Sequence, residues 1–362
     1  MSFLLYGATG YTGRLVARTA IARGHRPTLG GRRREAVEPL ARDLALPWTV
    51  TGLDDAAGLD AALVGHGAVL HCAGPFVHTS EPMVLACLRN RVHYLDITGE
   101  IPIFERLAGL GPMSREAGVS LLPGVGFDVV PTDCLAAHLA RRLPSATRLV
   151  LAFRGTGGLS RGTVLTMIEN LGRPGAVRRE GRIVPVPVAW KTREVDLGLS
   201  NVQRPRSNVH VMTIPWGDIA TAYHTTGIGD IEVYTAVSPG VVRLLRGTRW
   251  LAPLLATRMV RRGVAAVVRR RVSGPSAQAR AAGATVVWGE VEDPAGRRAA
   301  ARLHGPDGYT FTAETAVRAV ERVLAGGTPT GFLTPAKAFG PDFVLDVPGV
   351  SRQDLETTEE SS

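Results

Sequence analysis

The sequence is poor in cysteine and has no long apolar run. Its 362 residues include three cysteines, Cys72, Cys87 and Cys134, which lie far apart and form no C-x-x-C pair. This spacing argues against a disulfide framework or a structural zinc site and favours a reducing compartment. No apolar run is long enough to cross a bilayer, and the N-terminus lacks the regions of a secretory signal. We therefore expect a cytoplasmic protein that holds no metal.

Lysine and aromatic residues are also scarce. Lysine and arginine together number 42, nearly all of them arginine, against 32 acidic residues, which gives a net charge of +10. Such a balance favours anionic partners without choosing among them. Aromatic residues make up 6% of the chain and hydrophobic residues 45%. The length and this ordinary globular composition predict about two domains.

What the sequence does contain is a glycine-rich turn directly after its first apolar run. Phe3–Tyr6 predicts a strand, Gly7–Gly13 has the pattern G-x-x-G-x-x-G, and a helix is predicted from Tyr11 to Arg23. Glycines at such a turn let the backbone approach a pyrophosphate, and the N-terminus of the helix favours the anion. The alternative is an ordinary glycine-rich turn. The residues assigned to this dinucleotide site are Gly7, Thr9, Gly10, Tyr11, Thr12 and Gly13.

The end of the second predicted strand indicates which dinucleotide binds. An NAD site usually places Asp or Glu there, on the ribose 2′-hydroxyl, whereas an NADP site places arginine near the 2′-phosphate. This chain has Arg32, Arg33 and Arg34 after Leu29–Gly31, and its next carboxylate is Glu35. Guanidinium groups bind phosphate well. We therefore expect NADPH, held by Arg32 and Arg33, although a solvated basic helix start is the simpler alternative.

Strands and helices alternate through residues 1–130, which predicts a Rossmann-type, doubly wound parallel sheet in an α/β domain. The later strands are predicted at Trp48–Thr51, Ala68–Cys72, His93–Asp96 and Val119–Leu122. The helices are predicted near Arg34–Leu44, Asp55–Val64, Glu81–Arg89 and Ile103–Ala117.

After a helix near Pro131–Arg142 the pattern changes, and strands dominate. They are predicted at Arg148–Arg154, Ile183–Trp190, Val209–Ile214, Ile231–Val237 and Ala284–Glu290. We expect residues 131–312 to form a second, α+β mixed-sheet domain that supplies the substrate pocket. Residues 313–350, with a helix at Ala313–Leu324, are expected to return to the first domain. The polar, acidic tail 351–362 is expected to fray.

Several motifs occur in one order along the chain. They are Gly7–Gly13, Cys72–Phe76, Tyr94–Glu100, Gly126–Asp133 and Thr226–Tyr234. Together they resemble the saccharopine dehydrogenase-like NADP-binding oxidoreductases, and among these the bacterial branch that includes trans-acting enoyl reductases. The resemblance runs from about Met1 to about Gly349. It implies an NADP-binding Rossmann domain, a mixed-sheet second domain and a cytosolic reductase, but it does not imply a substrate, because the family covers several chemistries.

Two further segments are candidates for contact with the cofactor. Cys72–Phe76 closes the fourth predicted strand, where small residues would let the backbone reach the nicotinamide side, and we assign Ala73, Gly74, Pro75 and Phe76 to the site. A Gly-Pro turn of no further function is the alternative. Asp54 is a candidate for adenine, whereas Asp55 suits the N-cap of the next helix better.

Four residues are candidates for substrate or proton chemistry. Glu100 and Asp128 follow the fifth and sixth predicted strands, where a carboxylate would orient substrate or relay a proton; alternatively, each binds backbone N–H groups in a turn. Tyr223 and His224 lie in the second domain and both donate protons at neutral pH. A lone histidine on a strand, as His224 is read here, is more often structural.

Gly158–Gly162 matches the G-x-S-x-G nucleophile elbow of hydrolases, with Ser160 at its centre. His224 after Asp196 or Asp218 would complete the chain order of a triad. That reading leaves the first 130 residues unexplained. We read the segment as a glycine-rich turn on the substrate side.

Val241–Arg271 combines apolar residues with nine arginines, which predicts a pair of basic amphipathic helices. Such a segment would dock an acidic acyl carrier protein, contact an anionic membrane surface, or form a solvated lid. Nucleic acid suits it least, because aromatic residues are not interleaved with the arginines. The oligomeric state, including a homo-oligomer, stays open.

The sequence therefore predicts an NADPH-dependent reductase that delivers hydride to an activated double bond, an enoyl thioester first. Imine reduction is the alternative enzyme function, since the resemblance also permits it. A non-catalytic NADP-binding sensor is the alternative from another class, because it would keep the glycine turn but need no acid in the second domain.

Overall fold

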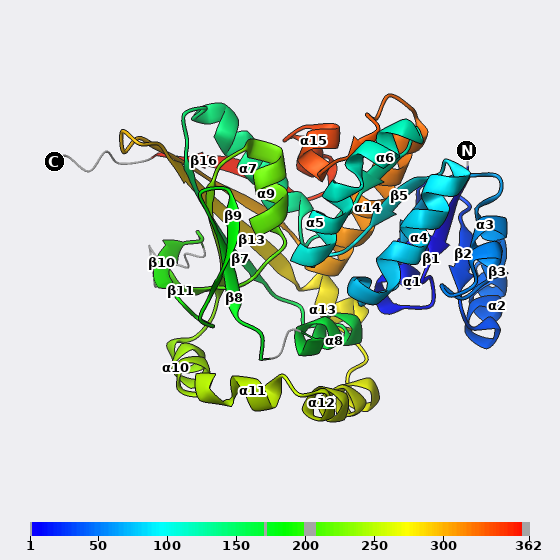
Figure 1. Cartoon of the computed structure of the whole chain (residues 1–362), viewed down its shortest axis with the longest axis horizontal. Coiled ribbons are helices and arrows are strands. Elements are labelled where there is room, and N and C mark those ends of the chain that lie inside the picture. The colour runs from blue at the N-terminus through cyan, green and yellow to red at the C-terminus, as the bar shows by residue number, and fades with distance from the viewer. Residues whose placement is uncertain (1, 170–171, 199–207, 357–362) are drawn as a thin grey trace. The chain divides into compact units, whose positions relative to one another are not determined.

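The computed structural model describes residues 2–169, 172–198 and 208–356, which fold into two compact units (Figure 1). Unit 1 comprises Met1–Val130 and Tyr309–Phe343, and unit 2 comprises Pro131–Gly308 and Val344–Ser362. None of the described helices combines the length and the apolar character that a membrane span needs.

Unit 1 is built on sheet A, whose strands follow the order β15-β6-β5-β4-β1-β2-β3 and are all parallel. The strands are β1 (Ser2–Tyr6), β2 (Thr28–Gly31), β3 (Trp48–Val50), β4 (His66–His71), β5 (His93–Asp96), β6 (Ser120–Leu122) and β15 (Gly331–Phe332). This order confirms the predicted doubly wound sheet, with β15 added to the six predicted strands. The chain reverses its direction of winding between β1 and β4, and ligands bind at such a point.

The helices of unit 1 cover both faces of sheet A. They are α1 (Tyr11–Ala22), α2 (Arg34–Asp43), α3 (Ala56–Leu63), α4 (Phe76–Asn90), α5 (Ile101–Gly109), α6 (Gly111–Glu116), α14 (Gly308–Leu324) and α15 (Pro335–Phe339), and the short 3-10 helix η2 (Phe343–Asp346) begins at the last residue of unit 1. One face carries a core in which Leu63, Met83 and Leu107 from three of these helices pack on Leu4 and Val69 of the sheet. Burial of such side chains contributes about 1.5–3 kcal/mol each.

The single helix predicted at Ile103–Ala117 is wrong, because α5 ends at Gly109 and α6 begins at Gly111. Pro112 is in the first turn of α6, where its missing N–H is tolerated. Within a continuous helix the same proline would remove a hydrogen bond and clash with the preceding turn.

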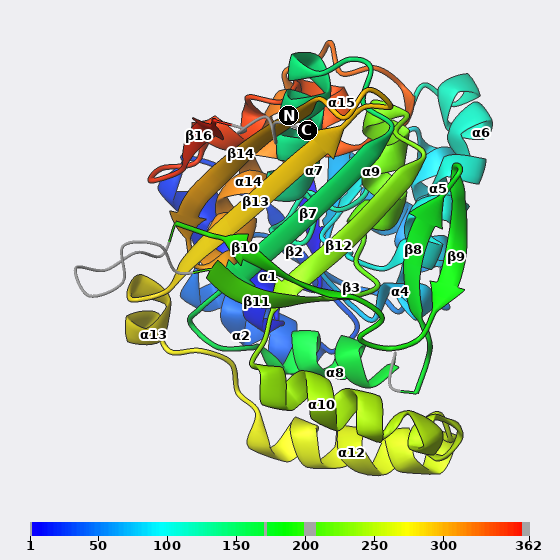
Figure 2. The same cartoon turned by 90° about the vertical axis from the view of Figure 1, so that its left-hand side faces the viewer.

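Unit 2 is built on the mixed sheet B, in which the order β10-β11-β12-β7-β13-β14-β16 is joined by a β8–β9 hairpin (Figure 2). Only β12 and β7 are parallel; the other pairs are antiparallel. The strands are β7 (Arg148–Gly155), β8 (Gly175–Arg179), β9 (Arg182–Val186), β10 (Thr192–Asp196), β11 (Asn208–Thr213), β12 (Asp230–Ala236), β13 (Ala284–Glu292), β14 (Arg298–Pro306) and β16 (Ser351–Leu355). The predicted α+β mixed-sheet domain is therefore confirmed.

The tail was expected to fray, but residues Ser351–Leu355 form β16, which pairs antiparallel with β14. The polar sequence does not prevent this pairing, because main-chain hydrogen bonds to an edge strand need no apolar side chains. The expectation for 357–362 lies outside the described residues.

The helices of unit 2 begin with α7 (Val130–Arg142), which packs against sheet B. Gly289 of β13 leaves the room that Leu135 and Leu139 of α7 occupy, since a β-carbon there would lie 2.8 Å from Leu139. The other helices are α8 (Arg161–Glu169), α9 (Asp218–Thr226), α10 (Pro239–Gly247), η1 (Arg249–Leu251), α11 (Ala252–Leu255), α12 (Arg258–Arg271) and α13 (Ala277–Ala281). The helix pair predicted for Val241–Arg271 is thus α10 and α12, with η1 and α11 between them.

Candidate functional site

The glycine turn follows β1, and two of its glycines are required by the protein's own packing. Gly7 has φ of +84°, in the left-handed region, and a β-carbon there would lie 2.7 Å from the backbone nitrogen of Ala73. A β-carbon on Gly13 would lie 2.4 Å from the carbonyl oxygen of Gly7. Neither position admits a side chain without movement of the backbone.

Gly10 differs from both. It is exposed, has extended backbone angles, and a β-carbon there would have one neighbour within 4 Å, the Gly7 carbonyl oxygen at 3.3 Å. Gly10 is the N-cap of α1, with no side-chain cap and no acidic residue in the first turn. The positive end of a 12-residue helix thus lacks a side-chain anion of its own. A pyrophosphate fits this position, where the backbone N–H groups of the first helical turn and the helix dipole both favour an anion.

Arg32 and Arg33 follow β2 and are exposed. Arg33 lies 4.0 Å from Glu35, whereas Arg32 has no carboxylate ion-pair partner within the described ranges. The Tyr6 hydroxyl donates to the Thr51 carbonyl oxygen at 3.0 Å. Burial raises the pKa of Tyr6, nearby Arg32 lowers it and Asp54 raises it, so both charges lie close to the phenol.

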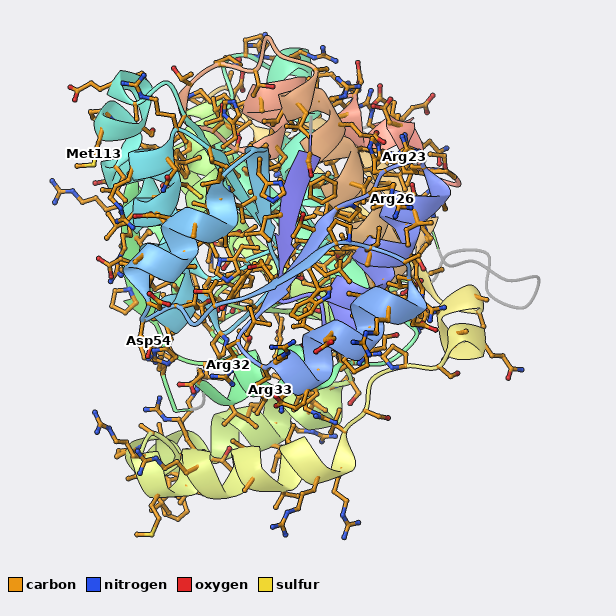
Figure 3. The ribbon with its side chains drawn as sticks, turned by 90° about the vertical axis from the view of Figure 1, so that its right-hand side faces the viewer. Arg23, Arg26, Arg32, Arg33, Asp54 and Met113 are labelled. Carbon is orange, nitrogen blue, oxygen red and sulfur yellow. The ribbon has the colours of Figure 1, made fainter. Side chains whose placement is uncertain are left out.

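Figure 3 shows Arg32, Arg33 and Asp54 at one end of unit 1 and Arg23 and Arg26 at the other. The first three come directly after β2 and β3, at the carboxyl edge of sheet A. Asp55 caps α3 by accepting from the Gly58 N–H at 2.9 Å, which confirms the N-cap prediction. The residues present therefore suit the adenosine and 2′-phosphate of NADP.

Glu100 is bound to the start of α4. Its two carboxylate oxygens accept from the N–H groups of Phe76 and Val77, each at 2.8 Å. Charge-assisted bonds of this kind stabilise a helix N-terminus. The Ala73–Phe76 segment leads into α4, and the Thr79 hydroxyl of that helix donates to the Ala73 carbonyl oxygen at 2.6 Å. These contacts favour the structural alternative for Glu100 over a role with substrate.

Asp128 is the carboxylate that stays suited to proton chemistry. It is half-buried beside Gly99, whose added β-carbon would lie 2.9 Å from its Oδ2 atom. Burial raises the pKa of Asp128 to about 6, and the charge of Glu100 adds to the effect. A carboxyl with its pKa near neutral exchanges a proton readily.

Asp96, at the end of β5, is a group that sequence reasoning missed. Its carboxylate accepts from the Tyr94 hydroxyl at 2.7 Å and from the N–H groups of Thr98 and Gly124 at 2.9 Å. Burial raises the pKa of Asp96 to about 6 in spite of these bonds. The Asp-x-Thr spacing of an Asx-type turn was the available signal. Asp96, Glu100 and Asp128 thus gather where β5 and β6 end.

Tyr223 and His224 are in unit 2, and placing His224 on a strand is wrong: both residues belong to α9. Gly227 ends this helix in the left-handed conformation, with φ of +76°. The Arg178 guanidinium lies 4.1 Å from the centre of the Tyr223 ring and donates to the carbonyl oxygens of Ile219 and Gly181. These contacts hold Tyr223 in place, and its role as a proton donor stays a prediction.

Ser160 does not have the geometry of a nucleophile elbow. Strand β7 ends five residues earlier, at Gly155. Ser160 is 3% exposed, and its hydroxyl accepts from the Thr163 N–H at 3.2 Å, at the start of α8. An elbow presents its hydroxyl to substrate. Ser160 is instead positioned as a helix cap.

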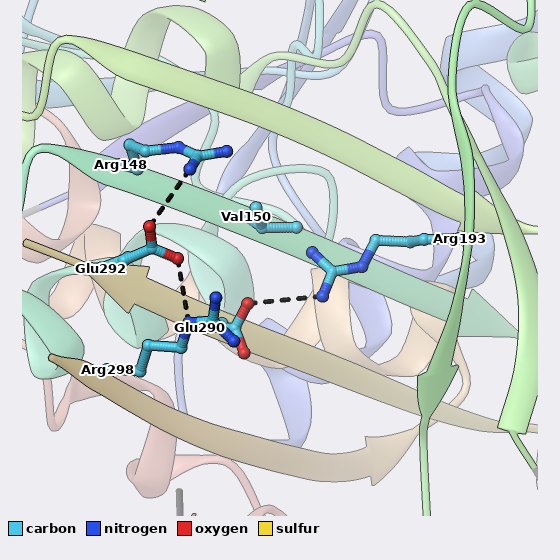
Figure 4. Close-up of a pocket in the computed structure, with 6 residues that line it drawn as sticks. All are labelled: Arg148, Val150, Arg193, Glu290, Glu292 and Arg298. Carbon is cyan, nitrogen blue, oxygen red and sulfur yellow. Dashed lines mark hydrogen bonds and ion pairs between the residues drawn. The ribbon is translucent and has the colours of Figure 1, made fainter. Parts of the chain in front are cut away.

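A cavity of about 170 Å³ lies on sheet B (Figure 4). Its charged groups satisfy one another: Arg148 and Arg298 pair with Glu292 at 3.1 and 2.9 Å, and Arg193 pairs with Glu290 at 3.3 Å. We assign no ligand to it. The described residues also contain no group of three or more His, Cys, Asp or Glu side chains suited to a metal ion.

Comparison with known proteins identifies the type of domain that unit 1 contains. Residues 3–117 match the family model of the saccharopine dehydrogenase NADP binding domain. Residues 3–117 thus form a saccharopine dehydrogenase-type NADP-binding domain, and the chain is an NADP-dependent oxidoreductase. The cofactor is accordingly NADP, as predicted. The matched residues include the glycine turn, Arg32 and the Ala73–Phe76 segment.

Several relatives cover different shares of the oxidoreductase. A trans-acting enoyl reductase of Mycobacterium bovis is 26% identical over 96% of this chain and 95% of its own length. That of Mycobacterium ulcerans is 29% identical over 54% of this chain, and the match spans about half of the relative's length. Saccharopine dehydrogenase of Saccharomyces cerevisiae has a TM-score of 0.64 at 12% identity, covering 98% of this chain and 100% of its own, which shows a shared fold. The relatives support an NAD(P)-dependent reductase.

Proposed function

We propose that this oxidoreductase delivers hydride from NADPH to the β-carbon of an α,β-unsaturated thioester, in lipid or polyketide-type biosynthesis. The observation that carries the cofactor part is the open N-terminus of α1 at Gly10, together with Arg32, which has no carboxylate ion-pair partner within the described ranges. The relatives named trans-acting enoyl reductases support the acceptor and support a substrate held on a carrier protein.

The residues of unit 1 would hold NADPH in a fixed orientation. Bound NADPH supplies the hydride. Gly7 and Gly13 shape the turn, Gly10 leaves space for the pyrophosphate, and Arg32 and Arg33 bind the 2′-phosphate. Asp54 is placed for the adenosine, and Ala73–Phe76 for the nicotinamide side. Thr9, Tyr11 and Thr12 are the other residues of the turn that are predicted to contact the cofactor.

A proton must reach the α-carbon after hydride reaches the β-carbon, because the thioester otherwise keeps the negative charge. We propose that Asp128 moves this proton, since its pKa near 6 lets the carboxyl both hold and release it. Tyr223 and His224 stay predictions as donors, and residues 131–312 stay the predicted source of the substrate pocket. Glu100 is assigned to the α4 N-terminus and not to substrate.

The test is NADPH consumption over a panel of an enoyl thioester, a cyclic imine and a ketone, with Gly10→Val as the cofactor-blocked control. We expect turnover of the enoyl thioester alone, no turnover by Gly10→Val, and nearly full turnover by Ser160→Ala. Turnover of the imine alone would assign imine reduction. NADPH binding without any turnover would favour a sensor.

A further inference from the structure

The basic segment Val241–Arg271 carries a high density of positive charge without any acidic residue. No Asp or Glu occurs between Val233 and Gly289 in the sequence. In unit 2 the segment forms α10, η1, α11 and α12, and Figures 1 and 2 both show α10 and α12 along one end of that unit. A surface of this kind has nothing of its own to neutralise it and attracts anions.

Large apolar side chains lie among these charges and face solvent. Met259 is 83% exposed and Trp250 76%, and three more exceed half, namely Leu244, Leu254 and Val267. They come from α10, η1, α11 and α12 in turn, so the apolar surface extends along the whole segment. Single exposed apolar residues are ordinary, but a contiguous series marks an interaction surface.

Helix α12 divides into an inner and an outer face. It packs on α8 through a face that contains buried Ala265 and half-buried Arg261 and Val268. Met259, Gly263, Ala266 and Arg270 recur at spacings of three or four residues and are exposed, so they share the opposite face. The outer face is thus a stripe of small and apolar residues beside arginine.

The eight arginines of the segment whose side chains the structure describes divide into two groups. Arg246, Arg249 and Arg261 donate to backbone carbonyl oxygens of Ala189, Val188 and Glu169 at 2.9–3.0 Å, which fixes the segment to the rest of unit 2. The second group is exposed and makes no ion pair with any residue that the structure describes. Its members are Arg243, Arg258, Arg262, Arg270 and Arg271.

We propose that the outer surface of α10, η1, α11 and α12 binds the surface of an anionic lipid bilayer. Helices that lie in a membrane interface place Trp, Leu and Met at the acyl boundary and arginine at the headgroups, and arginine stems reach outward from apolar surroundings. An acidic carrier protein would also neutralise the arginines, but it would need apolar side chains on its own docking face to cover Trp250, Met259 and Val267. A bilayer satisfies both the charge and the apolar area. The proposal does not depend on the substrate, since lipid binding needs no turnover.

The experiment is flotation of the full-length protein with vesicles of phosphatidylcholine alone or with about one third phosphatidylglycerol. We expect binding to the anionic vesicles, weakened as salt shortens the screening length from about 8 Å to about 3 Å. Trp250→Ser with Met259→Ser should weaken the binding at least tenfold, because each side chain loses its burial. The matched control is Met113→Ser in unit 1, where Met113 is 51% exposed and labelled in Figure 3.

The charge is tested separately by replacing Arg258, Arg262 and Arg270 with Gln, which should weaken the binding about fivefold for each arginine. Arg18→Gln and Arg182→Gln remove exposed arginines elsewhere and should leave it unchanged. Subtracting the emission of Trp250→Phe isolates the Trp250 signal, which should shift to the blue on vesicles. The proposal is wrong if the protein does not float with anionic vesicles, or if the control variants lose as much vesicle binding as the variants of the segment. It is also wrong if an acidic acyl carrier protein binds through the same arginines while vesicles do not.

Discussion

At the residue scale, different physical reasons explain why each of the three positions Gly7, Gly10 and Gly13 is glycine. The packing of Gly7 and Gly13 against neighbouring backbone excludes a side chain at both positions, whatever binds there. A β-carbon on Gly10 would make one tight contact, 3.3 Å from the Gly7 carbonyl oxygen, so the chain itself gives a weaker reason for glycine there. A bound pyrophosphate supplies the stronger one.

We therefore predict that Gly10→Val abolishes NADPH binding with little change in melting temperature. A valine β-carbon needs the Gly7 carbonyl oxygen, 3.3 Å away, to shift only slightly, but the side chain would occupy the proposed space of the pyrophosphate. Gly13→Val is the matched comparison and should lower stability by about 1–3 kcal/mol, because it forces the turn apart. Calorimetry with NADPH and thermal unfolding separate the two effects. Equal destabilisation by both substitutions would contradict the assignment.

Arg32 gives the second prediction at this scale. Arg32→Asp should weaken NADPH about 10- to 100-fold and leave NADH nearly unchanged, because only NADPH has the 2′-phosphate that the guanidinium binds. Arg34→Gln is the control, since Arg34 is already paired with Glu38 at 2.9 Å and lies over Trp48. Competition titrations with both cofactors measure the preference. If the wild-type protein binds NADH as tightly as NADPH, the role of Arg32 is wrong.

Asp128 makes a prediction about pH. Its folded pKa of about 6 lies above the ordinary value near 3.9, so the folded state binds more protons between these values. The contribution of Asp128 to stability is therefore greatest below about pH 4 and is lost as the pH rises through 6. Asp128→Asn should remove this loss and stabilise the protein by about 1–3 kcal/mol near pH 7, while turnover falls because the proton carrier is gone. Denaturant titrations near pH 4 and near pH 7, together with turnover numbers for the wild-type protein and the variant, test this prediction. Full turnover in the variant would assign Asp128 a structural role.

At the element scale, Glu100 joins two helices that sequence reasoning treats separately. It precedes α5, yet both its oxygens accept from the first N–H groups of α4. We predict that Glu100→Ala lowers stability by about 1–2 kcal/mol, as loss of a charged cap does. Turnover per folded molecule should change much less than in Asp128→Asn. A variant of full stability without turnover would return Glu100 to substrate chemistry.

The elements that sequence patterns predicted well are those with strong local signals. The first strand, the glycine turn and α1 follow from one another within the first 24 residues. The patterns failed where distant parts of the chain decide the structure. β14 and β16 form because main-chain groups pair across the sheet edge, and α9 is helical although its short sequence resembles a strand.

The candidate site was predictable to the same degree. Local spacing indicated Gly10 and Arg32, because the fold brings the ends of neighbouring parallel strands together. The separate roles of Glu100 and Asp128 were not predictable, since the cap contact of Glu100 spans 24 residues and the pKa of Asp128 depends on burial. The order of residues in the sequence indicates neither the cap contact of Glu100 nor the burial of Asp128.

At the scale of the whole molecule, cofactor binding is assigned to unit 1 and the proposed lipid contact to unit 2. The net charge of +10 is consistent with both, because NADPH and an anionic bilayer are each negative. On these two proposals, each unit uses arginine for a different anion.

The central claim is hydride transfer to a carbon–carbon double bond, and isotope transfer tests it most directly. NADPH deuterated at both hydrogens of nicotinamide C4 is supplied with an enoyl thioester, and the product is analysed by mass spectrometry and NMR. The account predicts one deuterium at the β-carbon and a solvent proton at the α-carbon, with Gly10→Val giving no labelled product. The account would be contradicted if no deuterium reached the enoyl thioester while NADPH is bound. It would also be contradicted if a parallel reaction supplied with an imine gave deuterium at the carbon of the former C=N bond.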